Sequence, residues 1–507
     1  MSNIIGIDLG TTMSALGCLN SIAKPEIIAN SDGERIMPSV ILFSSYESKA
    51  HIGADAKNAA ANEPDRVVKE FKREMHNPDY KFNLDNKEYS AAELSSMILK
   101  KLTQDASKEI GEIKDVVISV PAYFKEKQRN ATMMAGELAG LNVIGLINEP
   151  TAAALYYAST EDVKGTGLIY DLGGGTFDVT IVETNGNNIN VLSSEGDHHL
   201  GGVDFDNAVL EIFVDKYKKE KNADLYTNEG EKQEFLLTAE EAKKKLSSQS
   251  TIKQKLRGDA GSVVIEITQE EFEEKISNYI SRTELLTEQV FDEADIEISD
   301  IDYVLLVGGS TRLPIVSKSI KKLTGKDPIT KVNVDEAVAL GATIRAGLIS
   351  LDKNPDSMSS NISRELNNIR VVDVANHSYG TIVISYDESL EKYVDRNTII
   401  IKKNTPLPCS QTDTFYTTHE GQKEIDLSVT QGEDEDPDFV DMIHKDTMDL
   451  PPNRPEQQPI EFTYKYDENQ IMHCTFKDIN SGQSRDVQLS MSTKESSKSN
   501  VNSFIVE

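Results

Sequence analysis

The sequence predicts a multidomain chain in which an α/β region precedes an antiparallel β region. From the N-terminus to about residue 350, apolar β-branched runs alternate with amphipathic stretches, as strands alternate with helices in α/β domains. After that point the apolar runs are short, alternate with polar residues and are separated by turn residues, which is typical of a β-sandwich. A length of 507 residues is enough for two or three domains.

The α/β region contains clear examples of both kinds of element. The apolar runs Val116–Val120 and Tyr303–Val307 predict buried strands, because they are short and rich in β-branched and aliphatic residues. The longer stretches Ala91–Gln104 and Glu270–Ala294 have helical periodicity and predict amphipathic helices. The following stretch, 350–368, is polar and rich in Ser and Asn, so it predicts a linker.

The β region has the spacing of short strands joined by turns. The segments IVISY, IDLSV and MHCTF alternate apolar and polar residues, and turn signals such as Asn480-Ser481-Gly482 separate the runs. The last residues are rich in Ser, Lys and Asn and predict disorder. The expected divisions are an α/β domain at 1–352, a linker at 353–370, a β-sandwich at 371–492 and a disordered tail at 493–507.

Composition excludes several classes of function. The formal net charge is −31, which argues against a general nucleic-acid binder and against an anionic membrane surface, because both need a basic surface. The N-terminus lacks the pattern of a signal peptide, and no run has the apolar length of a membrane span. Cys18, Cys409 and Cys474 are far apart and form no metal-ligand spacing, so small, partly buried hydrophobes are the simplest interpretation. These features predict a cytoplasmic protein.

Two glycine-rich segments suggest a phosphate site. Ile4–Ser14 and Leu168–Val182 each consist of an apolar run, an Asp, a Gly/Thr turn and a return to β-branched residues. Such a hairpin brings backbone N–H groups and hydroxyls to a tight bend that can surround a phosphate. Two ordinary hairpins are the alternative, but the matching positions of Asp8 and Asp171 favour a duplicated domain that closes on one nucleotide.

Two further segments carry polar groups in suggestive places. Val304–Pro314 is a buried strand that runs into Gly-Gly-Ser and Arg312, and the strand ends of α/β sheets are where ligands bind. It gains weight from the helix start at 333–342, which contains Asp335. In 240–247, four polar residues, Glu240, Lys243, Lys244 and Ser247, share one helix face, for which a solvated charged face is the alternative.

Taken together and in this order, these segments resemble the seventy-kilodalton heat-shock (DnaK-type) chaperone family over about residues 3–492. The segments are IGIDLGTT, VPAYF, NEPTAAAL, DLGGGTFD, HLGG, GGSTR and DEAVALGA, followed in the β region by LSVTQGE and DINSG. The resemblance implies an actin-like ATPase domain of duplicated ribonuclease H-like lobes. It also implies a following β-sandwich that binds extended peptides.

The resemblance also implies roles for individual residues. Lys72, Glu149, Asp171 and Thr176 would be catalytic, with Lys72 stabilising the charge that develops on the γ-phosphate. Asp8, Asp171 and Asp178 would hold the cations, Mg²⁺ through its water shell and K⁺ beside Asp8 and Asp178. A surface lysine and a carboxylate at a helix start remain the plainer alternatives for Lys72 and Glu149.

Other roles follow from the same resemblance. ATP or ADP would be bound by Gly10, Thr11, Thr12, Gly174, Gly175, Glu240, Lys243, Lys244, Ser247, Gly309, Ser310, Arg312 and Asp335. Pro121 and Arg129 would relay the state of the nucleotide to the second domain. Phe415, Thr418 and Ile425 would lie on or near the peptide pocket, and core packing is the alternative for each of them.

Several departures predict a divergent, lidless member of that family. The chain stops where the family's helical lid would begin, so faster peptide exchange is expected. Arg370 lies in the usually apolar linker run, which puts docking of that run in doubt. Gly145 replaces a basic residue used for J-domain partners, and Lys244 stands where many members have an Arg that stacks better on adenine.

The function predicted from these features is that of an ATP-dependent chaperone. It would bind extended hydrophobic segments of unfolded polypeptides, with an affinity set by ATP binding and hydrolysis. A J-domain co-chaperone and a nucleotide exchange factor are candidate partners. The alternatives are a nucleotide-gated adaptor with little turnover and a small-molecule kinase, for which no acceptor-binding base is evident.

Overall fold

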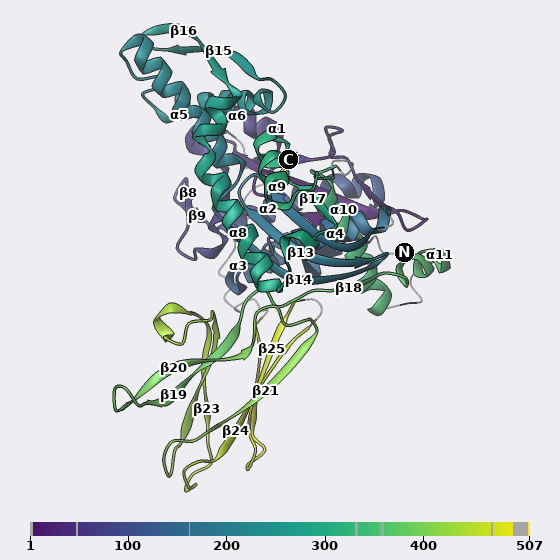
Figure 1. Ribbon diagram of the computed structural model, residues 1–507, viewed down its shortest axis with the longest axis vertical. Coiled ribbons are helices and arrows are strands. Elements are labelled where there is room, and N and C mark those ends of the chain that lie inside the picture. Colours follow the sequence, from purple (N-terminus) through teal and green to yellow (C-terminus); the bar gives the residue numbers. More distant parts are fainter. Residues whose placement is uncertain are drawn as a thin grey trace.

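The computed structural model describes residues 4–46, 49–161, 163–329, 333–353, 355, 359–467, 470–489 and 505–507. Figure 1 shows two α/β lobes above a β domain that hangs from them. We call residues 4–161 lobe I and residues 163–329 lobe II. Within the described residues, no helix combines the length and the apolarity that a membrane crossing needs.

The central sheet of lobe I has the strand order β11-β10-β1-β2-β3, with β4 paired to β2. β1 is antiparallel to β2 and parallel to β10. The predicted strand Val116–Val120 is confirmed as part of β10. The bounds are β1 Ile5–Asp8, β2 Met13–Leu19, β3 Pro25–Ile27, β4 Met37–Pro38, β10 Asp115–Val120 and β11 Asn142–Asn148.

The sheet of lobe II repeats this local arrangement. Its order is β17-β12-β13-β14-β18, and β12 is antiparallel to β13 and parallel to β17. The predicted strand Tyr303–Val307 is confirmed as β17. The bounds are β12 Lys164–Leu172, β13 Phe177–Asn185, β14 Asn188–Asp197, β17 Tyr303–Val307 and β18 Arg370–Val372. Each lobe thus places a glycine-rich hairpin beside a parallel strand.

Helices cover both sheets. The predicted helix Ala91–Gln104 is confirmed as part of α2, which Ser90 and Glu93 start with a reciprocal capping box. The predicted helix Glu270–Ala294 is two helices, α7 and α8, that meet at Ile276. The bounds are α1 Ala54–Ala59, α2 Ala91–Ile110, α3 Glu126–Leu138, α4 Glu149–Thr160, α5 Gly202–Lys221, α6 Glu229–Leu246, α7 Gln269–Lys275, α8 Ser277–Ala294, α9 Pro314–Thr324 and α10 Ala337–Lys353.

Helix α10 packs unusually close to lobe I. A Cβ added to Gly6 of β1 would lie 2.0 Å from the backbone N of Thr343, and one on Gly341 would lie 1.8 Å from the carbonyl O of Ala152 in α4. Only glycine allows these backbone approaches. The helix therefore joins β1, whose end carries the first glycine turn, to α4, which begins with Glu149.

Two smaller sheets and a hairpin decorate the lobes. In lobe I a mixed sheet has the order β27-β6-β5-β7, and β8 pairs with β9. In lobe II the hairpin β15-β16 extends beyond α5 and α6 (Figure 1). The bounds are β5 Val40–Phe43, β6 Lys49–Ile52, β7 Val67–Lys69, β8 Phe82–Leu84, β9 Lys87–Tyr89, β15 Thr251–Gly258, β16 Gly261–Thr268 and β27 Ile505–Val506.

Strand β27 corrects the expectation of a disordered tail over 493–507. Ile505 and Val506 pair in parallel with Lys49 and Ala50 of β6, and the side chain of Val506 is buried in the core of lobe I. The backbone N–H of Glu507 donates to Ala50 O at 2.9 Å. The expectation is wrong for these residues because one apolar side chain and an open sheet edge fix them; 493–504 lie outside the described residues.

The β domain consists of two antiparallel four-stranded sheets, as the alternating pattern predicts. Their orders are β20-β19-β22-β23 and β21-β24-β25-β26, and aromatic residues such as Tyr464 and Phe476 fill the space between them. The bounds are β19 Tyr379–Asp387, β20 Lys392–Ile401, β21 Cys409–Tyr416, β22 Glu424–Gln431, β23 Asp441–Asp449, β24 Pro459–Tyr466, β25 Met472–Asp478 and β26 Ser484–Gln488.

The predicted linker is partly ordered rather than an open spacer. Residues 360–366 form α11 (Ser360–Leu366), whose Ile362 and Leu366 are buried against the lobes, and Ser359 caps its first turn. The strand β18 then pairs in parallel with the edge strand β14, with Arg370 N donating to Asn187 O. Arg370 does not prevent the pairing of this run, because its side chain is exposed while its backbone pairs with β14.

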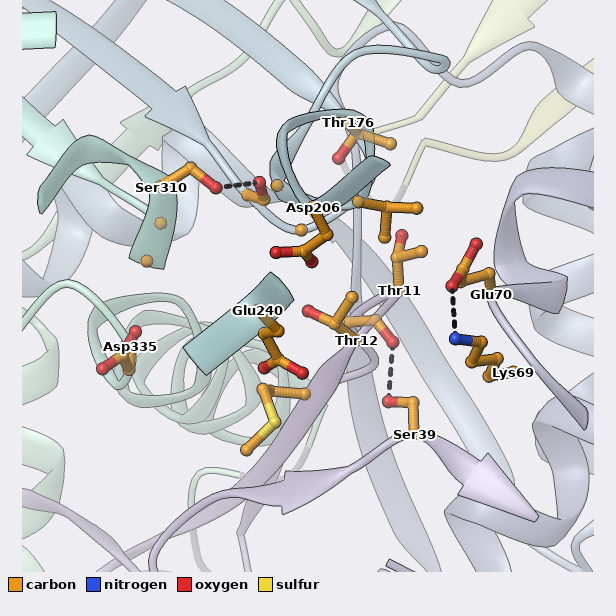
Figure 2. A pocket seen from close by; sticks show the side chains of 18 of the residues that line it. Thr11, Thr12, Ser39, Lys69, Glu70, Thr176, Asp206, Glu240, Ser310 and Asp335 are labelled. Carbon is orange, nitrogen blue, oxygen red and sulfur yellow. Dashed lines mark hydrogen bonds and ion pairs between the residues drawn. The ribbon is translucent and has the colours of Figure 1, made fainter. Parts of the chain in front are cut away.

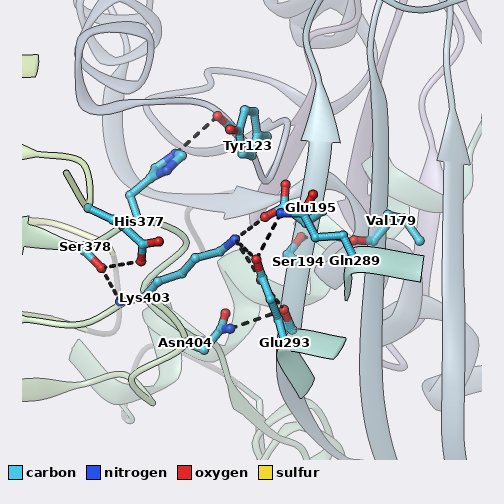
Figure 3. A network of polar contacts seen from close by, with 12 residues as sticks. Tyr123, Val179, Ser194, Glu195, Gln289, Glu293, His377, Ser378, Lys403 and Asn404 are labelled. Carbon is cyan, nitrogen blue, oxygen red and sulfur yellow. Dashed lines mark hydrogen bonds and ion pairs between the residues drawn. The ribbon is translucent and has the colours of Figure 1, made fainter. Parts of the chain in front are cut away.

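The β domain docks on both lobes. Figure 3 shows Lys403 of the β domain between two carboxylates of lobe II, Glu195 and Glu293, the second at 2.8 Å. On the lobe I side, the Nε2–H of His377 donates to the carbonyl of Tyr123 at 3.3 Å. Burial lowers the pKa of His377 to about 3, so this contact is made by a neutral imidazole.

A buried polar cluster lies where the linker, lobe I and the β domain meet. Asp373, directly after β18, accepts hydrogen bonds from Asn148 at 3.1 Å and from Gln470 at 2.8 Å. Arg129 of α3 donates to Asn148 at 2.6 Å and also to Gln470. Glu126 N, at the start of α3, donates to Gln431 at 3.1 Å. The three parts of the chain therefore share one hydrogen-bond network.

Candidate functional site

A cavity of about 710 Å³ lies between the two lobes, and both glycine-rich turns line it (Figure 2). The predicted site residues on its wall are Asp8, Gly10, Thr11, Thr12, Lys72, Glu149, Asp171, Gly174, Thr176, Glu240, Lys243, Lys244, Ser247, Gly309, Ser310, Arg312 and Asp335. These residues are spread over more than 300 positions of the sequence, and the fold brings them together. The size suits a nucleotide-sized ligand.

The two glycine-rich turns face each other at van der Waals contact. A Cβ on Gly174 would lie 2.1 Å from Thr12 Oγ1, and one on Gly175 would lie 2.5 Å from Thr11 Cγ2. A third loop closes on them, since a Cβ on Gly201 would lie 2.6 Å from Gly175 N. This packing explains the consecutive glycines and brings backbone N–H groups of both lobes around one space.

A lysine and four carboxylates lie beside these turns. Lys72, on the 3₁₀ turn η2 (Phe71–His76), makes a buried ion pair of 2.7 Å with Glu149 at the first position of α4. Asp8 ends β1 and accepts from Ser119 at 2.9 Å, and Asp178 of β13 accepts from Tyr123 N at 3.1 Å. Asp171 of β12 is also buried. Lys72 is thus the cation of a strongly acidic site.

The electrostatics of this cluster favour a cation. Burial, and then the charge of Glu149, raise the pKa of Asp178 to about 8 and the pKa of Asp8 to about 7. The pKa of Asp171 is raised for the same reasons, burial first. Carboxylates with raised pKa values hold protons at neutral pH. They can release these protons when a hard cation that prefers oxygen ligands binds. The donor set therefore fits a divalent ion such as Mg²⁺.

The opposite end of the cavity is lined by α6 and two turns of lobe II. Glu240 is paired with Lys57 of lobe I at 2.5 Å and with Lys244 at 2.7 Å. Burial acts to raise the pKa of Glu240, but these two ammonium groups outweigh it and lower the pKa to about 2. Glu240 is therefore an ionised acceptor that also connects the two lobes.

Other predicted site residues at this end of the cavity are also held in place by neighbouring groups. Lys243 donates to Gly202 O at 2.9 Å and pairs with Asp206 at 2.8 Å. Ser310 donates to Gly173 O at 2.8 Å (Figure 2). Arg312 forms a bidentate pair with Asp335 at 2.9 and 2.7 Å. Such pairs hold side chains in place before a ligand arrives.

Seven predicted residues lie off the wall of the cavity. Gly175 packs against Thr11, and Asp178 accepts from Tyr123 N. Pro121 O accepts from Phe124 N, and Arg129 contacts Gln470 of the β domain. The remaining members are the three residues that we expected near a peptide pocket. Phe415 and Ile425 pack against the core of the β domain, and Thr418 is exposed and bonds to Gln422.

Sequence reasoning missed the partners that position the site. Lys57 and Asp206 line the cavity, and Arg73 links Asp204 at 2.6 Å to Gly175 O at 3.0 Å across the lobes. The sequence indicates a role for Arg73 at this site only through its position directly after Lys72. The docking residues Asp373 and Gln470 were missed as well, although an acidic residue after the run RVV could have suggested the first.

A comparison with protein-family models agrees with this geometry. The model described as Hsp70 protein matches residues 4–82 and 74–507. The match covers both lobes, the linker and the β domain.

Proposed function

The chain belongs to the Hsp70 protein family, and we propose that it is an ATP-hydrolysing chaperone whose β domain binds extended peptides. Family membership supports a chaperone role in general, and members are generally ATPases that bind ATP or ADP with Mg²⁺. The further proposals are an actin-like ATPase domain, hydrolysis at the cavity described above and control of peptide affinity by the nucleotide.

One observation carries the proposal of hydrolysis. The buried pair Lys72–Glu149 lies beside two facing glycine turns, so a cation and a carboxylate sit where a terminal phosphate would end. Lys72 would stabilise charge that develops on the transferred phosphoryl group, and Glu149 would accept a hydrogen bond from the attacking water. The hydroxyl groups of Thr11, Thr12 and Thr176 would donate hydrogen bonds to phosphate oxygens.

The acidic residues would hold cations. Mg²⁺ would neutralise the phosphate oxygens, and Asp8 and Asp171 would hold it through its water shell. K⁺ would lie beside Asp8 and Asp178. At the other end, Glu240 would accept from the ribose, while Lys243, Lys244, Ser247, Arg312 and Asp335 would enclose the nucleoside.

The docked arrangement supports control of the β domain by the nucleotide. Asn148, one residue before Glu149, donates to Asp373 of the linker and accepts from Arg129. Movement of Glu149 toward a bound phosphate would therefore displace its neighbour Asn148. Asn148 contacts Asp373 of the linker directly and the β domain through Arg129. We propose that ATP favours the docked form with loosely held peptide and that hydrolysis releases the domain.

The variant Lys72→Ala tests the catalytic part. It should bind ATP yet hydrolyse it about 10²- to 10³-fold more slowly in single turnover, the usual cost of losing one charge-stabilising donor. Lys81→Ala, at an exposed lysine, is the matched control. Undiminished turnover by the Lys72 variant would refute the assignment.

A peptide-release experiment separates the chaperone from the adaptor. Release of a fluorescent extended peptide should be faster with ATP than with ADP. Equal release with both nucleotides, together with turnover near background, would instead support the nucleotide-gated adaptor.

A further inference from the structure

Three histidines meet outside the nucleotide cavity. His76, His198 and His199 each offer a ring nitrogen, and these three nitrogens lie within 4.8 Å of one another. The ring centroids are 5.6 Å apart for His76 and His198, 5.7 Å for His76 and His199, and 4.6 Å for His198 and His199. Three imidazoles gathered this closely are a common ligand set for transition metals.

Two of the rings have a nitrogen that is not engaged in a hydrogen bond among the described residues and could bind a metal ion. The Nδ1–H of His76 donates to the carbonyl of Arg73 at 2.9 Å, which leaves the lone pair on Nε2. Metal-binding histidines are usually fixed in this way, with the second ring nitrogen held by a backbone carbonyl or a carboxylate. Nδ1 of His198 is buried and has no hydrogen-bond partner among the described residues.

The cluster bridges the two lobes. His76 is the last residue of η2 in lobe I, one turn after Lys72. His198 and His199 follow β14 of lobe II and precede Gly201, which packs on the second glycine turn. A ligand shared by these rings would therefore connect the two walls of the nucleotide cavity from outside.

We propose that His76, His198 and His199 bind one divalent transition-metal ion of the Zn²⁺ class and that this ion restrains the movement of the lobes. Imidazole ligands favour Zn²⁺, Cu²⁺ and Ni²⁺ over Mg²⁺ and Ca²⁺, which prefer oxygen. The site is thus chemically distinct from the carboxylates of the cavity. Three protein ligands leave a fourth position for water in a tetrahedral complex.

The rings need only a small adjustment. Zn–N bonds of about 2.0–2.1 Å place tetrahedral ligand nitrogens about 3.4 Å apart. The nitrogens at up to 4.8 Å must approach by about 1.4 Å, within the reach of side-chain rotation. His199 is exposed, so the ion can enter from solvent.

Direct metal binding tests the ligand set without any nucleotide, so its outcome does not depend on the proposed ATPase activity. The untagged full chain is titrated with Zn²⁺ against a chromophoric chelator. We expect one Zn²⁺ per chain that excess Mg²⁺ does not displace, and at least tenfold weaker Zn²⁺ binding in His76→Ala and in His198→Thr. His473→Ala, in the β domain, is the matched control and should bind as the unmodified chain does. Absence of stoichiometric Zn²⁺ binding, or equal binding by the His76 and His198 variants, would overturn the proposal.

A second measurement tests the restraint of the lobes and rests on nucleotide binding. With Zn²⁺ buffered and Mg²⁺ in excess, release of a fluorescent ADP analogue should slow at least threefold in the unmodified chain and stay unchanged in His76→Ala. Circular dichroism melts without metal check that the variants fold. Zn²⁺ binding with unchanged release would refute the restraint and leave the metal site standing.

Discussion

Replacement of Gln470 by glycine should detach the β domain from the lobes while stabilising the β domain itself. The side chain of Gln470 is almost fully buried and joins two charged residues, accepting from Arg129 and donating to Asp373 at 2.8 Å. Its backbone has φ +62°, a left-handed conformation at the turn between β24 and β25 that glycine adopts without strain.

The two effects have opposite signs and can be separated. Each hydrogen bond to a charged group contributes about 1.5–3 kcal/mol, and Arg129 and Asp373 keep other partners, so we expect docking to weaken by about 3 kcal/mol. That is a change of about 150-fold in the docking equilibrium. The left-handed strain of about 1 kcal/mol exists whether or not the domain is docked, so its removal should raise only the stability of the β domain.

Two control variants isolate these contributions. Gln470→Ala removes the same hydrogen bonds but keeps the strain, so it should weaken docking without stabilising the β domain. Asn453→Gly relieves a left-handed residue, φ +60°, at an exposed position of the β domain. It should stabilise that domain and leave docking unchanged.

Hydrogen exchange at one amide reports docking. Glu126 is the first residue of α3, so its N–H has no partner within the helix and donates instead to Gln431 of the β domain. In Gln470→Gly this amide should lose protection, and small-angle scattering should show a larger radius of gyration. Unchanged protection and an unchanged radius would refute the assignment of Gln470 to docking.

Three further perturbations test other parts of the interface and the fold. In the docked form burial raises the pKa of Glu126 to about 7 and lowers the pKa of His377 to about 3, so rising pH weakens docking through Glu126 and strengthens it through His377. Between about pH 4.5 and 7, docking of Glu126→Gln, measured by the scattering radius, should therefore strengthen relative to docking of the unmodified chain. Lys403→Met leaves the buried Glu195 without its cation and should weaken docking by about 3 kcal/mol, measured by the same radius at pH 7.5. Val506→Asp places a charge in the core of lobe I and should lower its thermal midpoint, whereas Ile505→Asp, at an exposed position, should not.

The sequence predicted two glycine-rich turns that lie together, and the structure places both on one cavity. Gly174 and Gly175 are required by the approach of Thr12 and Thr11, and this requirement leaves a visible pattern of consecutive small residues. The strands β10 and β17 were predictable for a similar reason, since buried parallel strands are continuous apolar runs. In both cases the signal lies within a few neighbouring residues.

The docking contacts could not be predicted because they join residues that are distant in sequence. Lys403 and Glu195 are 208 positions apart, and Arg129 and Gln470 are 341 apart. Nothing near Gln470 shows that its side chain will meet Arg129. Helix α11 was missed because only Ile362 and Leu366 carry its apolar face within a polar stretch. The orientation of Arg370 depends on which edge strand receives β18.

The short strand β27 determines how mechanical load would travel through the chain. A handle attached after Glu507 would first pull on Val506 and the edge of β6, so the force would enter lobe I and bypass the β domain. In a single-molecule pulling experiment the first rupture should be small, because two paired residues and one buried side chain resist it. Only after that event would tension reach the β domain and then β18. Strand β27 would therefore act as a weak contact that must break before the docked β domain bears load.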